Sequence, residues 1–235
     1  MMTSTRSLAR IGGLLYLGVA VGGAFSELFV RSSVTVQGDA AATAANIVSH
    51  AGLFRLGLVS DLVDLVCFLG VALLMYAILK PVNQHVALAM LVINAVSVAI
   101  QAANLFNHAG ALVLATNPSL APGVSSLFLL EMHRQGYLIA QIFFGGYLLP
   151  LGYLVYKSGL FPRALGVVLM VGCAGYLGGI AASYLAPTMQ SGVATDLSMI
   201  GGLAELTFLL WLLIVGARVP DRVQAPDARS IGEAA

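Results

Sequence analysis

Four acidic residues lie in stretches of the sequence that are otherwise apolar: Glu27, Asp61, Asp64 and Glu205. Carboxylates in such positions can bind a cation, relay protons or pair with a basic side chain. If the stretches cross a membrane, each acid costs a few kcal/mol unless a partner compensates its charge. The first question is therefore which elements bring the acids to their partners.

The composition predicts an integral membrane protein. Hydrophobic residues make up 59% of the 235 positions and charged residues only 9%. A soluble domain carries about 25% charged residues, so this chain lacks the polar surface that water requires. The formal charge of +1 argues against a nucleic-acid partner. Cys67 and Cys173 lie in apolar segments, so we expect no disulfide framework.

Six apolar segments are long enough to cross about 30 Å of hydrocarbon. We place them near residues 9–30, 53–79, 86–114, 127–156, 163–185 and 196–217. The predicted fold class is all-α, an integral membrane bundle of six transmembrane helices in one domain, 1–217. We expect the first segment to be a span rather than a cleaved signal peptide, because its apolar run continues to Val30. Pro150 should kink the fourth helix.

The basic residues predict the orientation. If the N-terminus is cytoplasmic, eight of the eleven lysines and arginines fall on the cytoplasmic side, as the positive-inside rule expects. Both termini are then cytoplasmic, and the polar tail 218–235 should be disordered. In the longest outer linker, 31–52, an Ala-rich segment with Asp39 as N-cap predicts a short interfacial helix. The glycines of "GCAGYLGG", 172–179, favour close helix packing.

Five of the six segments carry strongly polar groups at a similar axial height, and the fifth carries none. Counting 1.5 Å per residue from each cytoplasmic end gives roughly 20–28 Å for this layer. The layer contains Glu27, Asp61, Asp64, Gln101, Asn104, Gln141 and Glu205. On the third segment, polar residues recur at three- and four-residue spacing, which predicts one inward stripe. The stripe consists of Asn94, Ser97, Gln101, Asn104 and His108.

Basic side chains lie just above this layer, at roughly 31–37 Å. They are Arg31, Arg55, His108, His133 and Arg134. We expect them to compensate the acids across helices. For Arg55 the first choice of partner is Glu27 and the second is Glu131. Arg134 is the expected partner of Asp61.

The predicted ligand-binding residues combine this layer with its basic rim. They are Glu27, Arg55, Asp61, Asp64, Gln101, Asn104, His108, Arg134, Gln141 and Glu205. The group is either a solvated chamber that opens outward or a closed network of salt bridges. No H-E-x-x-H, G-x-S-x-G or P-loop motif is present, and we expect no cofactor or metal. A mixed zinc site of His50, His108 and His133 with Asp61 or Glu131 is a weak alternative, because the spacing is irregular.

Several stretches of this chain resemble a known family. They include "ARIGGLLYL" (9–17), "GDAAATAANI" (38–47), "LFRLGLVSDLV" (53–63), "LLMYAILKPVNQHVALAML" (73–91) and "GLFPRALGVVLMVGCAGYL" (159–177). They are similar to a bacterial multi-pass membrane family catalogued as domain of unknown function forty-three eighty-six. The resemblance spans nearly the whole chain. It implies a bacterial inner-membrane protein and supplies no catalytic residues.

Three functions follow from these features. The leading hypothesis is a binding or transport-related module whose chamber takes a small cation, a polar solute or a lipid headgroup. The alternative is an intramembrane enzyme on a lipid or isoprenoid, with Asp61 or Asp64 and His108 or His133 as acid–base groups. A third is a structural or accessory subunit. The expected partners are the lipid bilayer and a small polar ligand or lipid; the oligomeric state stays open.

Overall fold

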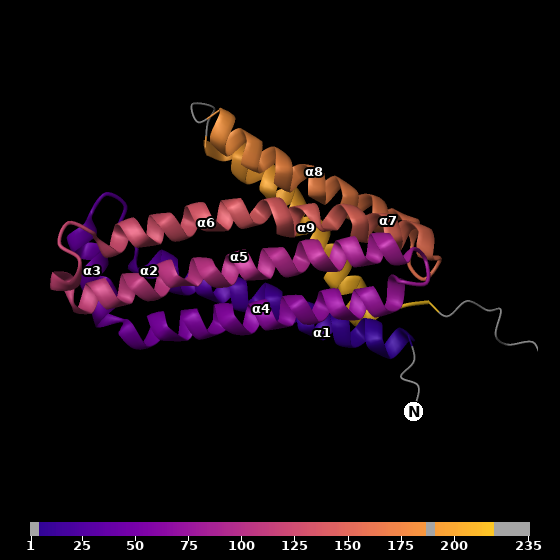
Figure 1. The fold of residues 1–235 in the computed structure, drawn as a ribbon, viewed down its shortest axis with the longest axis horizontal. Coiled ribbons are helices and arrows are strands. Elements are labelled where there is room, and N and C mark those ends of the chain that lie inside the picture. The colour runs from indigo at the N-terminus through magenta and orange to yellow at the C-terminus, as the bar shows by residue number, and fades with distance from the viewer. Residues whose placement is uncertain (1–4, 187–190, 219–235) are drawn as a thin grey trace, which may run out of the picture.

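The structure is a computed structural model that describes residues 5–186 and 191–218. Those residues form an all-helical bundle without a strand (Figure 1). Among them, six helices are long and apolar enough to cross a membrane, and each overlaps one of the six predicted segments. The predicted fold class is therefore confirmed. The predicted tail lies outside the described residues, except for Arg218.

The first span, Thr5–Val34, is not α-helical throughout. α1 (Thr5–Ala24) passes into a π-helical turn, η1 (Phe25–Arg31), and then into the short α2 (Ser32–Val34). A π turn holds more residues than an α turn, so the side chains beyond it are rotated relative to a regular α-helix. The turn therefore changes the direction in which Arg31 points.

α3 (Ala40–Ser49) is the predicted Ala-rich helix. The side chain of Asp39 accepts a hydrogen bond from the Ala42 amide at 2.8 Å, which caps the helix at its N-terminus as expected. Together with α2, α3 covers one end of the bundle, and the N-terminal part of α1 lies at the opposite end (Figure 1).

α4 (Ala51–Leu79) and α5 (Gln84–Thr116) are the second and third spans. Asn83 starts α5 by accepting a hydrogen bond from the Val86 amide at 3.1 Å. Most of the predicted inward stripe on α5 is buried, namely Asn94, Ser97, Asn104 and His108. Gln101 is half-buried. The three- and four-residue spacing thus predicted the inward face of this helix correctly.

The fourth span consists of α6 (Ser126–Gly146) and α7 (Leu148–Ser158), which are separated at Tyr147. Pro150 has no N–H to offer the carbonyl of Gly146 four residues earlier, and its ring crowds that carbonyl. The regular α-helix is interrupted at Tyr147, about one turn before the proline, and Tyr147 itself keeps helical backbone angles. After the short 3-10 turn η2 (Pro118–Leu120), α6 begins at an N-cap formed by Ser125.

α8 (Arg163–Leu185) and α9 (Ser191–Ile214) pack together through the predicted glycine face. A Cβ atom at Gly172 would lie 2.6 Å from the Cβ of Ala204, and one at Gly175 would lie 2.7 Å from the carbonyl oxygen of Leu197. Only glycine allows this approach. Toward the end that carries α3, the α8–α9 pair leans away from α6 (Figure 1).

At the other end the helices converge. A Cβ atom at Gly13 would lie 2.8 Å from the backbone nitrogen of Leu213, so α1 and α9 are in close contact there. A large apolar core fills this end and includes Tyr147, Phe208 and Leu212. The bundle is therefore packed tightly at one end and spread at the other.

Candidate functional site

A cavity of about 980 Å³ lies at the spread end of the bundle. Residues of the first span and of α4, α5, α6, α8 and α9 line it. Its volume is at the upper end of the range for small-molecule sites, about 300–1,000 Å³. The charged side chains in its lining are Glu27, Asp61, Asp64, Glu131, Arg31 and Arg134. Counted in their ionised forms, four carboxylates against two guanidinium groups give the lining a formal excess of two negative charges.

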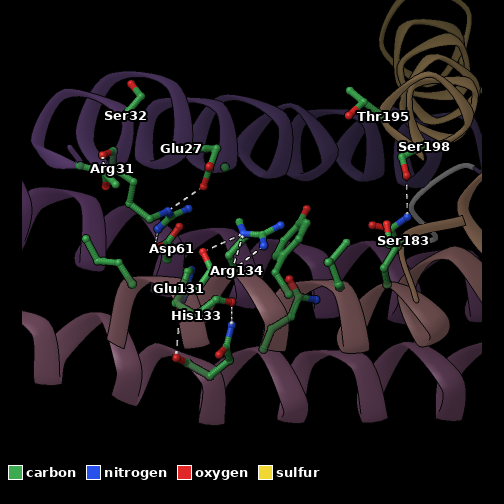
Figure 2. Close-up of a pocket in the computed structure, with 18 of the residues that line it drawn as sticks. Glu27, Arg31, Ser32, Asp61, Glu131, His133, Arg134, Ser183, Thr195 and Ser198 are labelled. Atoms are coloured by element: carbon green, nitrogen blue, oxygen red, sulfur yellow. Dashed lines mark hydrogen bonds and ion pairs between the residues drawn. The ribbon is translucent and has the colours of Figure 1, made fainter. Parts of the chain in front are cut away.

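Different parts of the lining have different chemistry. Figure 2 shows Glu27, Asp61, Glu131 and Arg134 projecting toward one another on one side of the view. The hydroxyl-bearing residues Ser183, Thr195 and Ser198 lie on the other side. Small apolar residues complete the wall, namely Ala182 of α8, Ala186 directly after α8 and Ala194 of α9. The cavity therefore offers charge, hydroxyl groups and apolar surface to one occupant.

Arg31 is the cation that compensates Glu27 and Asp61, one acid from each of the first two spans. Its Nε lies 2.7 Å from Oε2 of Glu27, and its Nη1 lies 2.7 Å from Oδ2 of Asp61. Nη1 also donates to Oγ of Ser26 at 2.8 Å. The Arg31 and Asp61 side chains are only 11% and 10% exposed. A buried pair of this kind needs such additional hydrogen bonds to offset its desolvation.

The predicted partners of Arg55 and Arg134 are wrong. Arg55 is exposed and makes no hydrogen bond or ion pair within residues 5–186 and 191–218. It therefore pairs with neither Glu27 nor Glu131. Arg134 binds Glu131 on its own helix, with Nη2 2.5 Å from Oε1, and not Asp61. The π turn explains the error, because it directs Arg31 toward Asp61.

His108 supports this arginine and does not line the cavity. The ring is fully buried, with Nδ1 3.2 Å from Nη1 of Arg31 and Nε2 3.2 Å from the carbonyl oxygen of Phe54. Arginine can only donate, so Nδ1 accepts and Nε2 carries the hydrogen that is donated to Phe54. His108 is thus a neutral positioning residue for Arg31 rather than a member of a charged rim.

His133 is oriented differently and does line the cavity. Its Nδ1 lies 3.3 Å from the carbonyl oxygen of Asn104, which can only accept, so Nδ1 carries the hydrogen. Nε2 then has a free lone pair, and it has no hydrogen-bond partner in the described part of the chain. The Asn104 side chain in turn donates to the carbonyl oxygen of His133 at 2.8 Å. α5 and α6 thereby fix this imidazole in one tautomer.

Asp64 differs from the other acids of the lining. Glu27, Asp61 and Glu131 each bind an arginine. Asp64 is half-buried and lines the cavity, yet it has no hydrogen bond or ion pair with any other described residue. Gly23 leaves space beside it, since a Cβ there would lie 3.7 Å from Oδ2 of Asp64. This carboxylate is open to an occupant of the cavity.

Two glutamine side chains of the cavity wall make different contacts: Gln101 binds within α5, and Gln141 joins α6 to α8 and α9. Gln101 donates to Oγ of Ser97 at 3.0 Å. Gln141 donates to the carbonyl oxygen of Tyr176 at 3.2 Å and to Oγ of Ser198 at 3.0 Å. Seven of the ten predicted site residues line the cavity: Glu27, Asp61, Asp64, Gln101, Asn104, Arg134 and Gln141. Arg55, His108 and Glu205 do not.

Glu205 lies apart from the cavity lining, among tyrosines. Tyr16 donates to its Oε1 at 2.5 Å and Tyr176 to its Oε2 at 2.6 Å. The hydroxyl of Tyr147 lies 2.8 Å from that of Tyr16. None of these tyrosines is among the predicted site residues, and the fifth span, for which no polar group is predicted, supplies Tyr176. The available signal was a tyrosine within an apolar span, whose hydroxyl needs a partner when buried.

The histidines do not form the zinc site that the sequence analysis considered. The described residues contain no group of three or more His, Cys, Asp or Glu side chains that could hold a metal ion. His50 is exposed and contacts Ser49 and the carbonyl oxygen of Asn46 near the end of α3.

The fold and the lined cavity define a multi-pass membrane protein with a polar chamber among its helices. The chain belongs to the family described as Domain of unknown function (DUF4386), which it matches over residues 11–216. The family resemblance is thus confirmed. The chain is also 28% identical over 158 residues to an uncharacterized protein of Archaeoglobus fulgidus, covering 66% of this chain and 81% of that one. No solved structure matches the chain.

Proposed function

We propose that the protein binds or transports a molecule with an ammonium group in this cavity, and that Asp64 is its counter-ion. The observation that supports the proposal most directly is the unpaired Asp64 carboxylate in a cavity whose lining has excess negative charge. An intramembrane carboxylate without a protein partner is stabilised when a cation binds beside it. The ammonium group belongs either to a water-soluble amine or to a lipid headgroup.

The size and lining of the cavity favour an organic cation over a bare ion. A volume of about 980 Å³ far exceeds what one ion fills, and the described acids and histidines are not clustered as metal ligands. Ser183, Thr195 and Ser198 supply hydroxyl groups for a polar remainder of the ligand. The alanines of α8 and α9 suit a short apolar portion.

The proposal includes an orientation in which the cavity opens to the outside of a bacterial inner membrane. Eight of the eleven lysines and arginines favour it. Topology reporters fused after Lys80 and after Lys157 should both report the cytoplasm, whereas one fused near Pro118 should report the outside. A reporter at Lys80 that reads outside would reverse the orientation and make the chamber face inward.

Asp64→Asn is expected to weaken binding of ammonium probes by about thirtyfold or more. Loss of one partner of a desolvated charge pair costs about 2 kcal/mol at least, which corresponds to that factor in Kd. The measurement is calorimetric titration of the full chain in detergent with ethanolamine and with choline. Asp196→Asn is the matched control, because Asp196 is an exposed acid of α9 that does not line the cavity.

A second arm separates the two sources of the ammonium group. Nanodiscs that contain phosphatidylethanolamine should protect the wild-type protein against thermal unfolding more than phosphatidylglycerol nanodiscs if the ligand is a lipid. If the ligand is instead a water-soluble amine, ethanolamine in solution should bind to the protein directly. If neither source binds, or if Asp64→Asn binds as well as wild type, Asp64 is not the counter-ion of an ammonium ligand.

An intramembrane enzyme remains the second candidate because of His133. Its fixed tautomer presents the Nε2 lone pair without a described partner, as a general base requires. Its substrate would be a lipid that enters the same cavity. Incubation with a bacterial lipid extract followed by mass spectrometry distinguishes this candidate: a product that forms with wild type and not with His133→Gln would favour an enzyme.

A further inference from the structure

We propose that Glu205 and the tyrosines Tyr16, Tyr147 and Tyr176 form a proton-binding site, separate from the cavity and coupled to it. The site itself stands on the geometry of these four residues. Its coupling to the cavity rests on the proposed function, because it concerns how a cation at Asp64 and a proton at Glu205 affect each other.

The hydrogen-bond geometry identifies Glu205 as the acceptor of the cluster. Tyr16 and Tyr176 each donate to one of its two oxygens. Since the hydrogen of Tyr16 is used in this way, Tyr147 donates to the oxygen of Tyr16. Two phenol donors solvate the ionised carboxylate. α1, the α6–α7 junction, α8 and α9 each contribute one of the four groups.

A proton is the cation that this site can accommodate. No lysine, arginine or histidine in the described chain forms an ion pair with Glu205. None of the four residues lines the cavity. The ring of Tyr176 is held between α6 and α9, where a Cβ atom at Gly145 would lie 2.6 Å from the Cβ of Tyr176, and Gly201 also touches this ring. Protonation adds one O–H bond to the carboxylate and needs no additional volume within this packing.

The proposed coupling between Glu205 and the cavity acts through Asp64. The cluster adjoins the cavity wall: Gln141, which lines the cavity, donates to the carbonyl oxygen of Tyr176 at 3.2 Å, and the ring of Phe144 contacts both Tyr176 and the lining residue Tyr137. Tyr16, Tyr147 and Tyr176 are neutral hydroxyl donors, so the charge that we expect to act on Glu205 is that of an ionised Asp64 in the cavity lining. Two like charges in a medium of low dielectric constant repel strongly.

This repulsion links the proton to the ligand. In the empty protein, a proton on Glu205 relieves the repulsion from an ionised Asp64. A cation at Asp64 neutralises that charge, which allows Glu205 to release its proton. By thermodynamic linkage, acidification must then weaken cation binding by the same coupling. The site would make uptake of an organic cation an exchange for a proton.

Infrared difference spectroscopy of the full chain tests the site without any ligand. On titration from alkaline to acidic pH, the wild-type protein should gain a carboxylic-acid carbonyl band that Glu205→Gln lacks and Asp64→Asn retains. Tyr176→Phe keeps the acid and removes one donor, so it should shift this band if Glu205→Gln fails to fold. The proposal is overturned if no such band titrates in wild type, or if the band survives in Glu205→Gln.

Calorimetry tests the coupling. Ethanolamine binding, measured in two buffers of different ionisation enthalpy, should release protons from wild type and fewer from Glu205→Gln, while Glu205→Gln still binds the probe. Equal proton release in both proteins would refute the coupling. If ethanolamine does not bind at all, the proposed function fails, and the infrared experiment still decides whether Glu205 is a proton site.

Discussion

Arg31→Met is expected to lower the free energy of unfolding by about 3–5 kcal/mol. The Asp61 side chain is 10% exposed, and the change removes its one arginine partner among the described residues. His108 does not replace the guanidinium, because its Nδ1 lies 3.7 Å from Oδ2 of Asp61, beyond hydrogen-bond distance. Glu27 is much less affected, since its side chain is 64% exposed and solvated. Thermal and chaotrope unfolding in detergent would measure the loss.

Arg55→Met is the matched control for this prediction. Arg55 is exposed and has no ion pair in the described part of the chain, so its replacement should change stability by less than about 0.5 kcal/mol. Arg31→Met combined with Asp61→Asn should recover most of the loss, because no buried charge then remains. Equal stability of the Arg31 and Arg55 variants would show that the pair seen at Asp61 contributes nothing.

Gly152→Ala is expected to destabilise the protein by about 3 kcal/mol, the upper end of the usual cost of overpacking. α7 and α8 cross at Gly152 and Gly166. A Cβ atom at Gly152 would lie 2.6 Å from the carbonyl oxygen of Gly166, and a Cβ at Gly166 would lie 2.5 Å from that of Gly152. Because the obstacle is backbone, a side-chain rotation cannot relieve it, and the two helices must separate.

Gly146→Ala is the appropriate comparison. Gly146 is the last residue of α6, six residues before Gly152, and a Cβ atom there would meet nothing within 4 Å. Alanine is also the better helix former by about 1 kcal/mol. Gly146→Ala should therefore be neutral or stabilising in the same unfolding assay. A Gly152→Ala protein that unfolds at the wild-type temperature would contradict the close crossing of α7 and α8.

The sequence predicted the fold class and much of the polar layer because both depend on simple counting. Length and apolarity identify a span, and 1.5 Å per residue gives the height of each polar group along it. The height along the helix axis alone correctly grouped six residues, from four spans, that line the cavity. On α5, five polar residues at regular spacing also fixed the rotation of the helix, and this face is correct.

The errors arose where rotation about the helix axis decided the outcome. Glu205 has nearly the height of the cavity residues, but it points toward Tyr16 and Tyr176 instead. Arg31 and Arg55 have similar heights, and a regular α-helical first span gave no reason to prefer Arg31 as the partner of Asp61. The choice between them depends on η1, for which hydrophobic periodicity carries no signal.

The π turn also sets a limit on how the length of this chain can vary. Before η1, the close contact between α1 and α9 at Gly13 fixes the rotation of the helix. At the end of η1, Arg31 binds Asp61. Removal of one residue between Phe25 and Val30 would restore a regular α-helix and rotate everything beyond it by about 100° relative to everything before it. A shortened chain could then preserve either the contact between α1 and α9 at Gly13 or the ion pair between Arg31 and Asp61, but not both. Deletions in this segment should therefore be far less tolerated than substitutions at its exposed positions Leu28 and Phe29.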